Sequence, residues 1–267
     1  MTQINILGCG WLGLPLAKAL LNNGFSVNGS TTSGDKIPVL NQLGVNPFLI
    51  ALNSENIQGD IISFLEHSEI LLIDIPPKLR GNSKEDFVGK MKTLIPFIEK
   101  SSVEKVLFVS STSVYADENV IVTEETPPQP ETESGRQLLQ SEQLLQNNTH
   151  FKTTIVRFGG LMGEDRHPIR FLSGRDAIEN PNAPINLIHL EDCIGIITQI
   201  IQQNSWGEIY NGVTPFHPSR ESYYVNKAIK LNLDLPKFNH SNPSIGKTII
   251  SNKLESVLHY EFIRKTL

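Results

Sequence analysis

The sequence predicts an α/β fold with a Rossmann-like, doubly wound parallel sheet, helices on both of its faces and a small C-terminal substrate lobe. Two observations predict this fold: short apolar, β-branched runs alternate with longer amphipathic stretches, and a glycine-rich turn follows the first run. Nearly continuous apolar strands are typical of parallel sheets that are covered on both faces. The right-handed crossover rule then leaves few topologies for the repeated β-α-β units.

The first part of the chain supplies strands and helices in alternation. Six apolar runs predict strands, at Ile4–Leu7, Phe25–Asn28, Phe48–Leu52, Ile70–Ile75, Val106–Ser110 and Thr154–Phe158. Five amphipathic stretches predict helices, at Leu12–Asn22, Lys36–Leu43, Ile57–Glu66, Glu85–Glu99 and Gly135–Gln146. We therefore expect residues 1–160 to form a dinucleotide-binding Rossmann core.

The pattern changes after Gly159, where loops rich in Gly, Pro and Asn follow one another. A strand is expected at Asn186–His189, a helix at Cys193–Gln203 and a further strand at Glu208–Asn211. We therefore expect residues 161–267 to hold the remaining sheet elements, interleaved with a small substrate-binding lobe, in one compact unit with the core.

The composition argues for a small-molecule partner. The formal net charge is −5, from 23 basic and 28 acidic residues without a basic cluster, which is unlike proteins that bind nucleic acid or an anionic membrane surface. The two cysteines, Cys9 and Cys193, and the seven histidines show no spacing typical of a metal site or a disulfide framework. No apolar run approaches the ~20 residues that span a bilayer. We expect a cytoplasmic protein without a metal site, and a homodimer stays open.

A glycine turn follows the first predicted strand, with the sequence Gly8-Cys9-Gly10-Trp11-Leu12-Gly13. In a dinucleotide-binding turn the first glycine permits the tight bend, the second lets the backbone approach a pyrophosphate, and the third lets the helix pack on the strand. The helix that starts near Leu12 would direct free N–H groups at the phosphates. The strand-turn-helix context favours cofactor binding over a turn that is only structural. The predicted cofactor-binding residues of the turn are Gly8, Gly10, Trp11, Leu12 and Gly13.

The end of the second predicted strand bears on the choice between the two nicotinamide dinucleotides. Sites that prefer NAD place an Asp or Glu there for the ribose 2′-hydroxyl, whereas a 2′-phosphate repels that carboxylate. This chain has Ser30, Thr31 and Thr32 instead, and Lys36 is the nearest cation. Asp35 weakens the argument, and a Ser/Thr-rich solvent loop that ends in a helix cap is the alternative. We expect NADP(H) to be favoured over NAD(H).

Three further residues are expected to line the cofactor. Ile75 and Pro76 lie at the end of the fourth predicted strand, and Ser110 ends the fifth. Open α/β sheets bind their ligands outside the carboxyl ends of the strands. These residues are therefore expected to lie beside the dinucleotide.

Further motifs resemble those of a known family. Val109–Tyr115 reads VSSTSVY, Gly159–Gly163 reads GGLMG, and Asn186–Asp192 and Tyr210–Gly212 follow in the same order. Together with the glycine turn, these segments resemble the extended short-chain dehydrogenase/reductases of the nucleotide-sugar epimerase/dehydratase group over nearly the whole chain. The resemblance implies that Ser111 matches the family's serine or threonine that polarises the substrate oxygen.

The chain departs from this family where the catalytic Tyr-x-x-x-Lys pair is expected. The matching segment is Ser134–Glu142, in which Ser134 and Leu138 replace the tyrosine and the lysine. A phenol with an ordinary pKa of ~10 acts near neutrality only beside a positive charge, and Leu138 supplies none. The chain thus resembles an atypical branch that keeps the cofactor site without the catalytic pair. The candidate catalytic residues are Ser111, Tyr115 and Ser134, with packing under the next loop as the alternative role of Tyr115.

Two classes of function follow. The first is an NADP(H)-dependent oxidoreductase or epimerase-like enzyme that acts on a sugar or nucleotide derivative. The second is a non-catalytic NADP(H)-binding sensor or scaffold. The loop after Gly163 holds Asp165, Arg166, His167 and Arg170, which suit recognition of an anionic group or a solvated charged loop equally well.

Three other polar residues are expected to have structural roles. His189 and Asp192 suit a strand-end hydrogen bond and a helix cap better than an acid/base pair. Arg157 is expected to bond carbonyl groups or a carboxylate at the end of its strand.

Overall fold

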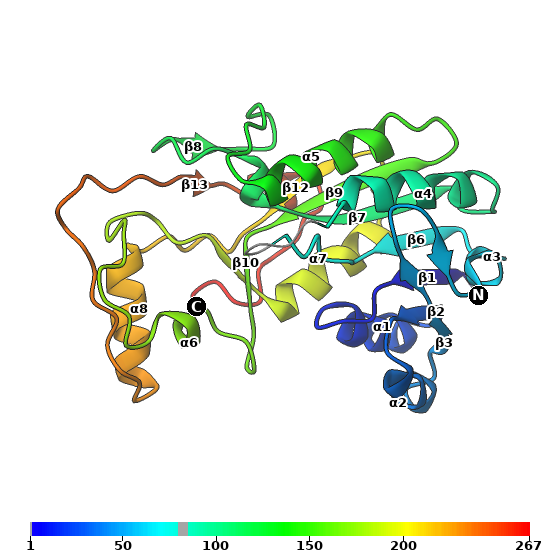
Figure 1. The fold of residues 1–267 in the computed structure, drawn as a ribbon, viewed down its shortest axis with the longest axis horizontal. Helices are drawn as coiled ribbons and strands as arrows, with labels where there is room; N and C mark the ends of the chain where they lie inside the picture. The colour runs from blue at the N-terminus through cyan, green and yellow to red at the C-terminus, as the bar shows by residue number, and fades with distance from the viewer. Residues whose placement is uncertain (1, 80–84) are drawn as a thin grey trace.

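The computed structural model describes residues 2–79 and 85–267. Within them, seven strands form the central sheet: β1 (Gln3–Leu7), β2 (Ser26–Thr31), β3 (Asn46–Leu49), β6 (Ile70–Ile73), β7 (Lys105–Ser111), β9 (Lys152–Phe158) and β12 (Ile209–Gly212). Their order is β12-β9-β7-β6-β1-β2-β3, and all neighbours pair in parallel (Figure 1). The predicted Rossmann-like fold is confirmed. The strand order reverses at β1 and β6, which is where open α/β sheets bind their ligands.

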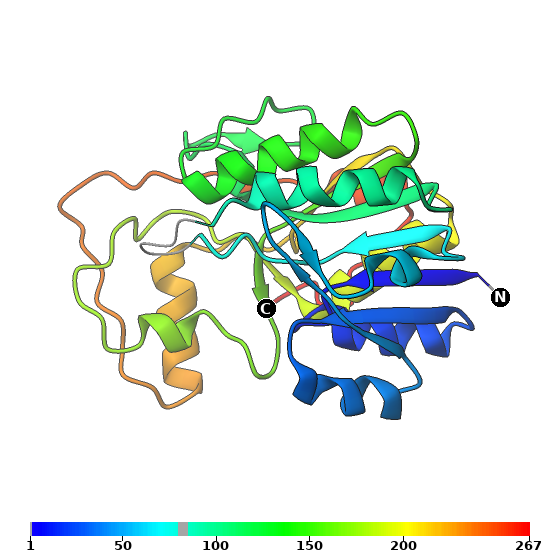
Figure 2. The same cartoon turned by 45° about the vertical axis from the view of Figure 1, so that its right-hand side comes forward.

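Helices cover both faces of the sheet. One face carries α1 (Gly13–Asn22), α2 (Ile37–Gln42) and α7 (Leu190–Gln202). The other carries α3 (Ile61–Leu65), α4 (Phe87–Glu99) and α5 (Glu133–Gln146). Figure 2 shows α4 and α5 above the strands and α1 and α2 below them. The glycine turn therefore leads from the sheet into the first helix of one layer.

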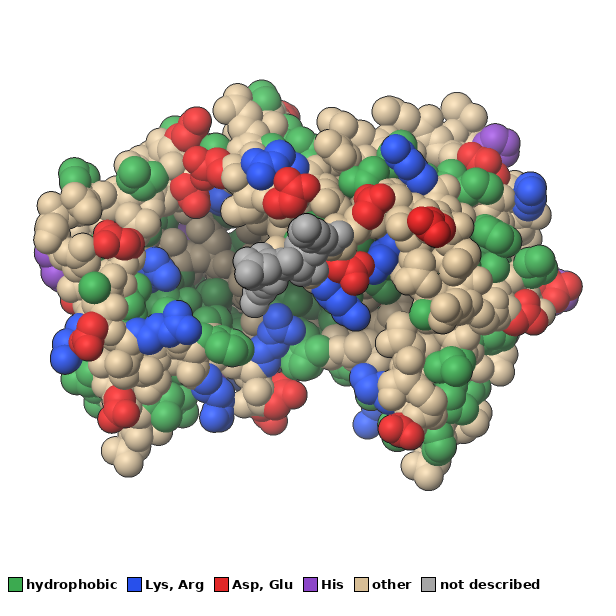
Figure 3. Space-filling model, in the orientation of Figure 1, with side chains coloured by type: hydrophobic (Ala, Val, Ile, Leu, Met, Phe, Trp, Pro, Cys, Tyr) green, Lys and Arg blue, Asp and Glu red, His purple; other side chains and the backbone are tan. Residues whose placement is uncertain are grey.

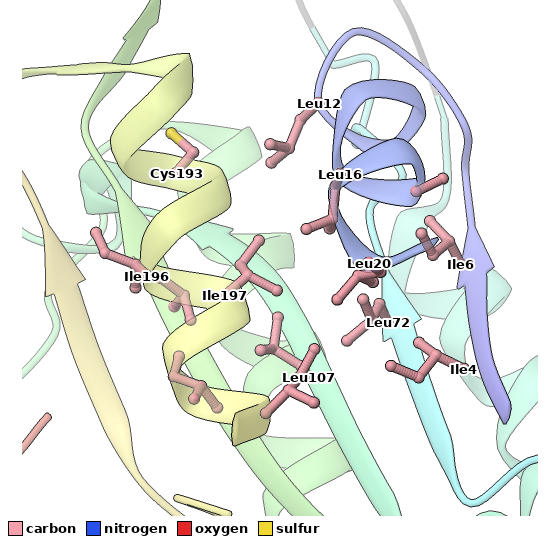
Figure 4. Close-up of a cluster of buried hydrophobic side chains, with 14 of the residues drawn as sticks. Ile4, Ile6, Leu12, Leu16, Leu20, Leu72, Leu107, Cys193, Ile196 and Ile197 are labelled. Carbon is pink, nitrogen blue, oxygen red and sulfur yellow. The ribbon is translucent and has the colours of Figure 1, made fainter. Parts of the chain in front are cut away.

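The buried cluster under α1 and α7 fixes the position of that first helix. Figure 4 shows aliphatic side chains from the strands and from both helices meeting there, among them Ile4, Ile6, Leu16, Leu20, Leu72, Ile196 and Ile197. Burying one such side chain contributes about 1.5–3 kcal/mol. The start of α1, with the turn that precedes it, is thus anchored by the main core.

A small lobe stands at one end of the sheet. It contains α6 (Ile169–Leu172) and α8 (Arg220–Lys230), and β10 (Gly160–Met162) pairs in parallel with β11 (Leu187–His189) where the chain enters and leaves it. Its core consists of Met162, Ile169, Ile185, Leu187, Tyr223, Tyr224 and Ala228. The C-terminal residue Leu267 packs against this core, and Figures 1 and 2 both show the C-terminus beside α6.

Short elements complete the described residues. They are η1 (Gly34–Lys36), β4 (Ala51–Leu52), β5 (Ile57–Gln58), η2 (Thr112–Val114), β8 (Ile121–Val122), β13 (Thr248–Ile249) and α9 (Asn252–Ser256). Strands β4 and β5 pair antiparallel, and β13 pairs in parallel with β8. None of the helices in residues 2–79 and 85–267 combines the length and apolar character needed to cross a membrane.

Some predicted boundaries were wrong. The predicted helix Ile57–Glu66 is reduced to α3. Its first two residues form β5, and Gly59, with φ of +98°, turns the chain between β5 and α3. Asp60 then caps α3 by accepting a hydrogen bond from the Ser63 N–H at 3.0 Å. The predicted strand Phe48–Leu52 is divided between β3 and β4.

The C-terminal part differs more. The predicted strand Asn186–His189 corresponds to β11, which pairs with β10 and does not join the central sheet. Helix α8 was not predicted, although Ser219 caps it by accepting a hydrogen bond from the Ser222 N–H. The large buried side chains of α8 are the adjacent Tyr223 and Tyr224. Its sequence therefore lacks the spaced aliphatic residues that mark the earlier helices.

Candidate functional site

The glycine turn lies at the carboxyl end of β1, at the reversal of the strand order. Gly8 has φ of +111°, and a Cβ there would overlap the carbonyl oxygen of Asp74, which follows β6. A Cβ on Gly13 would overlap the carbonyl oxygen of Gly8. The fold therefore requires glycine at both positions, whatever the turn binds.

Gly10 differs, because nothing in the fold requires a glycine there. It is exposed, its φ lies outside the left-handed region, and no atom of residues 2–79 or 85–267 lies within 4 Å of the position that its Cβ would take. Within the described residues, the backbone N–H groups of Trp11 and Leu12 donate no hydrogen bond. Helix α1 has no side-chain cap and no acidic residue in its first turn. The turn thus presents free donors and open space, as a phosphate site at a helix N-terminus does.

Ser30 supports the turn from β2. Its Oγ accepts a hydrogen bond from the Gly8 N–H at 2.9 Å, and its carbonyl oxygen accepts one from the Cys9 N–H at 2.7 Å. Its side chain is buried. The structure therefore gives this predicted cofactor-binding residue a positioning role and does not expose its hydroxyl to a 2′-phosphate.

The remaining predicted residues at the end of β2 divide into buried and exposed ones. Thr31 is buried, and its Oγ1 accepts a hydrogen bond from the Ser33 N–H at 3.1 Å. Thr32 and Lys36 are exposed, as is Asp35 between them. Thr32 and Lys36 are therefore the groups that solvent or a ligand can reach at this strand end.

Asp74 was not singled out in the sequence, yet it lies directly against the glycine turn. Its N–H donates to the Leu7 carbonyl oxygen at 2.9 Å, and its carboxyl faces the backbone N–H of Gly13. Burial raises the pKa of Asp74 to about 8, while the Gly13 N–H and the positive charge of Arg166 act in the opposite direction. The available signal was a single acid at the end of an apolar strand. Of its neighbours, Ile75 lies against Gly8, whereas Pro76 is exposed.

Ser111 ends β7 and caps η2, where its Oγ accepts a hydrogen bond from the Ser113 N–H at 3.2 Å. The N-terminus of α5 packs against the same turn, because a Cβ on Gly135 would overlap the Ser113 carbonyl oxygen. Ser134 precedes that contact and is partly buried. Leu138 is 3% exposed and belongs to the hydrophobic core on this face of the sheet. The structure thus brings Ser134 to the turn that follows Ser111, and it places no charge at Leu138.

Tyr115 is sealed inside a polar network. It is 2% exposed, its hydroxyl donates to Asn211 Oδ1 at 3.0 Å, and it accepts from Arg157 Nη1 at 2.7 Å. Burial raises the pKa of Tyr115. The geometry favours the structural alternative for this residue over the catalytic one. A buried, engaged phenol does not reach a substrate without a rearrangement of the network.

Arg157 forms the centre of the same network. Its guanidinium binds the carboxylate of Glu142 at 2.6 Å, and the Ser110 hydroxyl donates to that carboxylate as well. The predicted role of Arg157, bonding a carboxylate at a strand end, is confirmed. Ser110 is buried, and its hydroxyl is turned toward Glu142.

The charged loop after Gly163 does not act as one group. Asp165 accepts a hydrogen bond from the Trp11 indole, and Arg166 lies over the Trp11 ring. His167 is buried, and desolvation lowers its pKa to about 4, so it is neutral at pH 7 and is not a cation for anion recognition. Arg170 is exposed.

His189 and Asp192 have structural roles, as expected, but the helix cap is His189 and not the acid Asp192. His189 caps α7, with its Nδ1 accepting from the Glu191 N–H at 3.3 Å. The buried carboxylate of Asp192 accepts from the Tyr260 hydroxyl at 2.8 Å and from the Ile263 N–H at 2.7 Å. Both residues therefore hold the C-terminal segment and the helix start in place.

Figure 3 shows a hollow between the small lobe and the sheet, with hydrophobic side chains in its depth and Lys or Arg side chains at its rim. Gly163, which follows β10, lies against Trp11 of the glycine turn. The arrangement offers a glycine turn with free N–H donors and, at the end of β7, the hydroxyl of Ser111.

Comparison with known proteins agrees with this geometry. No protein-family model matches the chain. Protein YeeZ of Escherichia coli (strain K12) is 35% identical over 264 residues, which cover 98% of this chain and 96% of YeeZ. The chain belongs to the YeeZ family.

Several solved structures share the fold of this YeeZ-family chain. A protein from Methylobacillus flagellatus, assigned to the NAD-dependent epimerases/dehydratases, is 27% identical with a TM-score of 0.78, covering 99% of this chain and 94% of that one. A conserved protein of unknown function from Silicibacter pomeroyi has a TM-score of 0.80 at 21% identity over 100% and 95% of the two chains. The UDP-glucuronic acid 4-epimerase from Bacillus cereus, solved in complex with NAD, has a TM-score of 0.79 at 18% identity over 100% and 92%. The YeeZ-family chain thus has the fold of the NAD-dependent epimerase/dehydratase and short-chain dehydrogenase/reductase proteins among its structural neighbours.

Proposed function

We propose that this chain binds a nicotinamide dinucleotide at the glycine turn, NADP(H) in preference to NAD(H), and acts as an oxidoreductase or epimerase-like enzyme on a sugar or nucleotide derivative. The observation that carries the proposal is Gly10, a glycine that neither the backbone nor the packing requires. Open space at that point is explained if a ligand passes there. The solved neighbours that bind NAD and UDP-sugars support the same classes of cofactor and substrate.

The residues present fit such a cofactor. Trp11 and Leu12 have N–H groups that donate to nothing in the described part of the chain and could donate to the pyrophosphate. Thr32 and Lys36 are exposed at the end of β2, with the acid Asp35 beside them, and Lys36 would neutralise a 2′-phosphate. A bound dinucleotide would supply hydride transfer, and the chain's own groups would bind and orient it.

On the substrate side, Ser111 is the residue proposed to orient the reacting oxygen. Its hydroxyl lies at the end of β7, partly buried, with one acceptor position used by the Ser113 N–H. Leu138 occupies the position one helical turn from Ser134 and, unlike a lysine, supplies no charge that would make the Ser134 hydroxyl more acidic. Ser134 is therefore a weak proton donor in this proposal.

A non-catalytic sensor or scaffold is the second candidate. It is favoured by the burial of Leu138 and by the complete engagement of the Tyr115 hydroxyl, which leave no activated phenol near Ser111. Under this alternative the dinucleotide binds as proposed and no substrate is turned over.

The cofactor preference is tested by calorimetric titration with NADPH and NADH. We expect NADPH to bind at least several-fold more tightly, and Lys36→Ala to narrow the gap by weakening NADPH alone, because only NADPH carries the 2′-phosphate. Lys100→Ala removes an exposed lysine after α4 and serves as the matched control with both affinities unchanged. Equal affinities for wild type, or tighter binding of NADH, would contradict the preference.

The chemistry is tested by screening sugar and nucleotide derivatives with NADPH. Since Ser134 and Leu138 replace the tyrosine and lysine, we expect no measurable epimerisation or 4,6-dehydration of common nucleotide sugars. For any reduction that is found, Ser111→Ala should lower kcat by roughly 10²-fold, whereas Ser134→Ala should change it little. Absence of turnover with every compound, together with tight dinucleotide binding, would favour the sensor; a strong loss in Ser134→Ala would assign the proton transfer to Ser134.

A further inference from the structure

The turn Gly163–Arg166, which leads from β10 into the small lobe, is docked on the glycine turn. It is closed by two hydrogen bonds, from the Gly163 N–H to the Arg166 carbonyl at 2.7 Å and from the Arg166 N–H to the Gly163 carbonyl at 3.2 Å. Trp11 is the residue on which it rests, because a Cβ on Gly163 would lie only 2.9 Å from the indole Cζ2. The absence of a side chain at Gly163 lets the two turns meet.

Two side chains of this turn hold the indole of Trp11 from different directions. Asp165 Oδ1 accepts a hydrogen bond from Trp11 Nε1 at 3.0 Å. The guanidinium carbon of Arg166 lies 4.9 Å from the centre of the ring, in a cation–π arrangement. Arg166 is thereby kept beside the residue whose backbone N–H is free for a phosphate.

The charge of Arg166 is not neutralised within the described residues. Arg136, Arg157 and Arg264 each pair with a glutamate, whereas no carboxylate in residues 2–79 or 85–267 forms an ion pair with Arg166. Arg166 is also partly buried. Its charge reaches Asp74, whose carboxyl faces the Gly13 N–H on the other side of the turn. A free cation therefore lies near the helix N-terminus where the anion is expected.

From this geometry we infer that Arg166, presented by Trp11, binds the pyrophosphate of the dinucleotide opposite the N–H groups of Trp11 and Leu12. The inference rests on the proposed function and adds to it a cofactor contact that comes from the entrance of the small lobe. A planar guanidinium that is already stacked on an aromatic ring donates two parallel hydrogen bonds to phosphate with little further loss of freedom. The dinucleotide would then tie the lobe that faces the substrate to the glycine turn.

The test compares variants by titration with NADPH and NADH. Arg166→Ala should weaken both by the same factor, roughly ten-fold, because both carry the pyrophosphate. The same loss is expected for ADP-ribose, which keeps the pyrophosphate, and none for 2′-AMP, which lacks it. Lys36→Ala should differ from Arg166→Ala by weakening the binding of NADPH alone. Arg175→Ala removes an exposed arginine of the same lobe and should bind both dinucleotides as wild type does.

The role of charge is checked by salt. Wild-type affinity should fall as salt rises, more steeply than that of Arg166→Ala, and Arg166→Lys should recover part of the loss. Thermal unfolding confirms that each variant is folded; a folded Arg166→Lys that binds like Arg166→Ala would contradict a role of the charge.

The failures are distinguishable. If wild type binds neither dinucleotide, the proposed function fails and the inference with it. If wild type binds and Arg166→Ala binds equally well, the inference alone is overturned. It is also overturned if Arg166→Ala weakens the binding of NADPH only, because Arg166 would then contact the 2′-phosphate. The same holds if Arg166→Ala weakens the binding of 2′-AMP as much as that of ADP-ribose, because the substitution would then disturb the whole site.

Discussion

Gly10→Val is expected to abolish dinucleotide binding and to leave the fold intact. The Cβ of the new valine would enter space that holds no atom of the described residues within 4 Å, so the substitution causes no steric clash there. A branched side chain there would occupy the path of the pyrophosphate along the Trp11 and Leu12 N–H groups. We expect a loss of at least about a hundred-fold in affinity, about 2.8 kcal/mol, with unfolding free energy changed by less than about 1 kcal/mol.

The other glycines of the turn provide the contrast. Gly13→Val should unfold or strongly destabilise the protein, because its Cβ would overlap the Gly8 carbonyl oxygen. Gly10→Ala should give an intermediate loss of binding at unchanged stability. Calorimetry and thermal unfolding measure the two properties separately. A Gly10→Val protein that melts like wild type and still binds NADPH tightly would show that the turn does not hold the phosphates.

The sequence predicted the fold because its strongest signals are local. Strand β1, the glycine turn and α1 follow one another within a short stretch, and each has a distinctive pattern that no distant contact has to supply. The prediction failed where a single residue decides the backbone. Gly59, with its positive φ, divides an amphipathic stretch that otherwise resembles one helix. Helix α8 was missed because its buried tyrosines face a small lobe that has no counterpart in the strand-helix rhythm.

The site was predictable only in its local part. The open space at Gly10 agrees with the role assigned from the motif, but the hydroxyl of Ser30 turned out to support Gly8. Contacts between distant segments carry no signal in a single sequence: Trp11 and Asp165 are 154 positions apart. The same holds for Asp74, which lies against the glycine turn only because β6 pairs with β1. The sequence shows that the loop after Gly163 is charged, but it does not show that Arg166 lies over the ring of Trp11 in the glycine turn.

Arg157→Met is expected to destabilise the fold by about 3–5 kcal/mol. The Arg157 side chain is 3% exposed and that of Glu142 is fully buried, and the pair is joined by hydrogen bonds from Nη2 at 2.6 Å and from Nε at 3.1 Å. Removing the guanidinium leaves a buried carboxylate without its positive partner and leaves the Tyr115 hydroxyl without one of its two hydrogen bonds. Chemical denaturation measures the loss as a lower midpoint.

Two matched variants separate the buried pair from arginine loss in general. Arg136→Met removes a guanidinium whose partner Glu133 is half exposed, and an ion pair of that kind contributes only about 0.2–1 kcal/mol. The double variant Arg157→Met with Glu142→Met removes both buried charges, so it should recover much of the stability that Arg157→Met alone loses. Recovery would be incomplete, because Ser110 and Tyr115 each lose a hydrogen-bond partner. A double variant with a lower free energy of unfolding than Arg157→Met would contradict this account. It would mean that the Glu142 carboxylate stabilises the fold even without its arginine, through its hydrogen bond from Ser110.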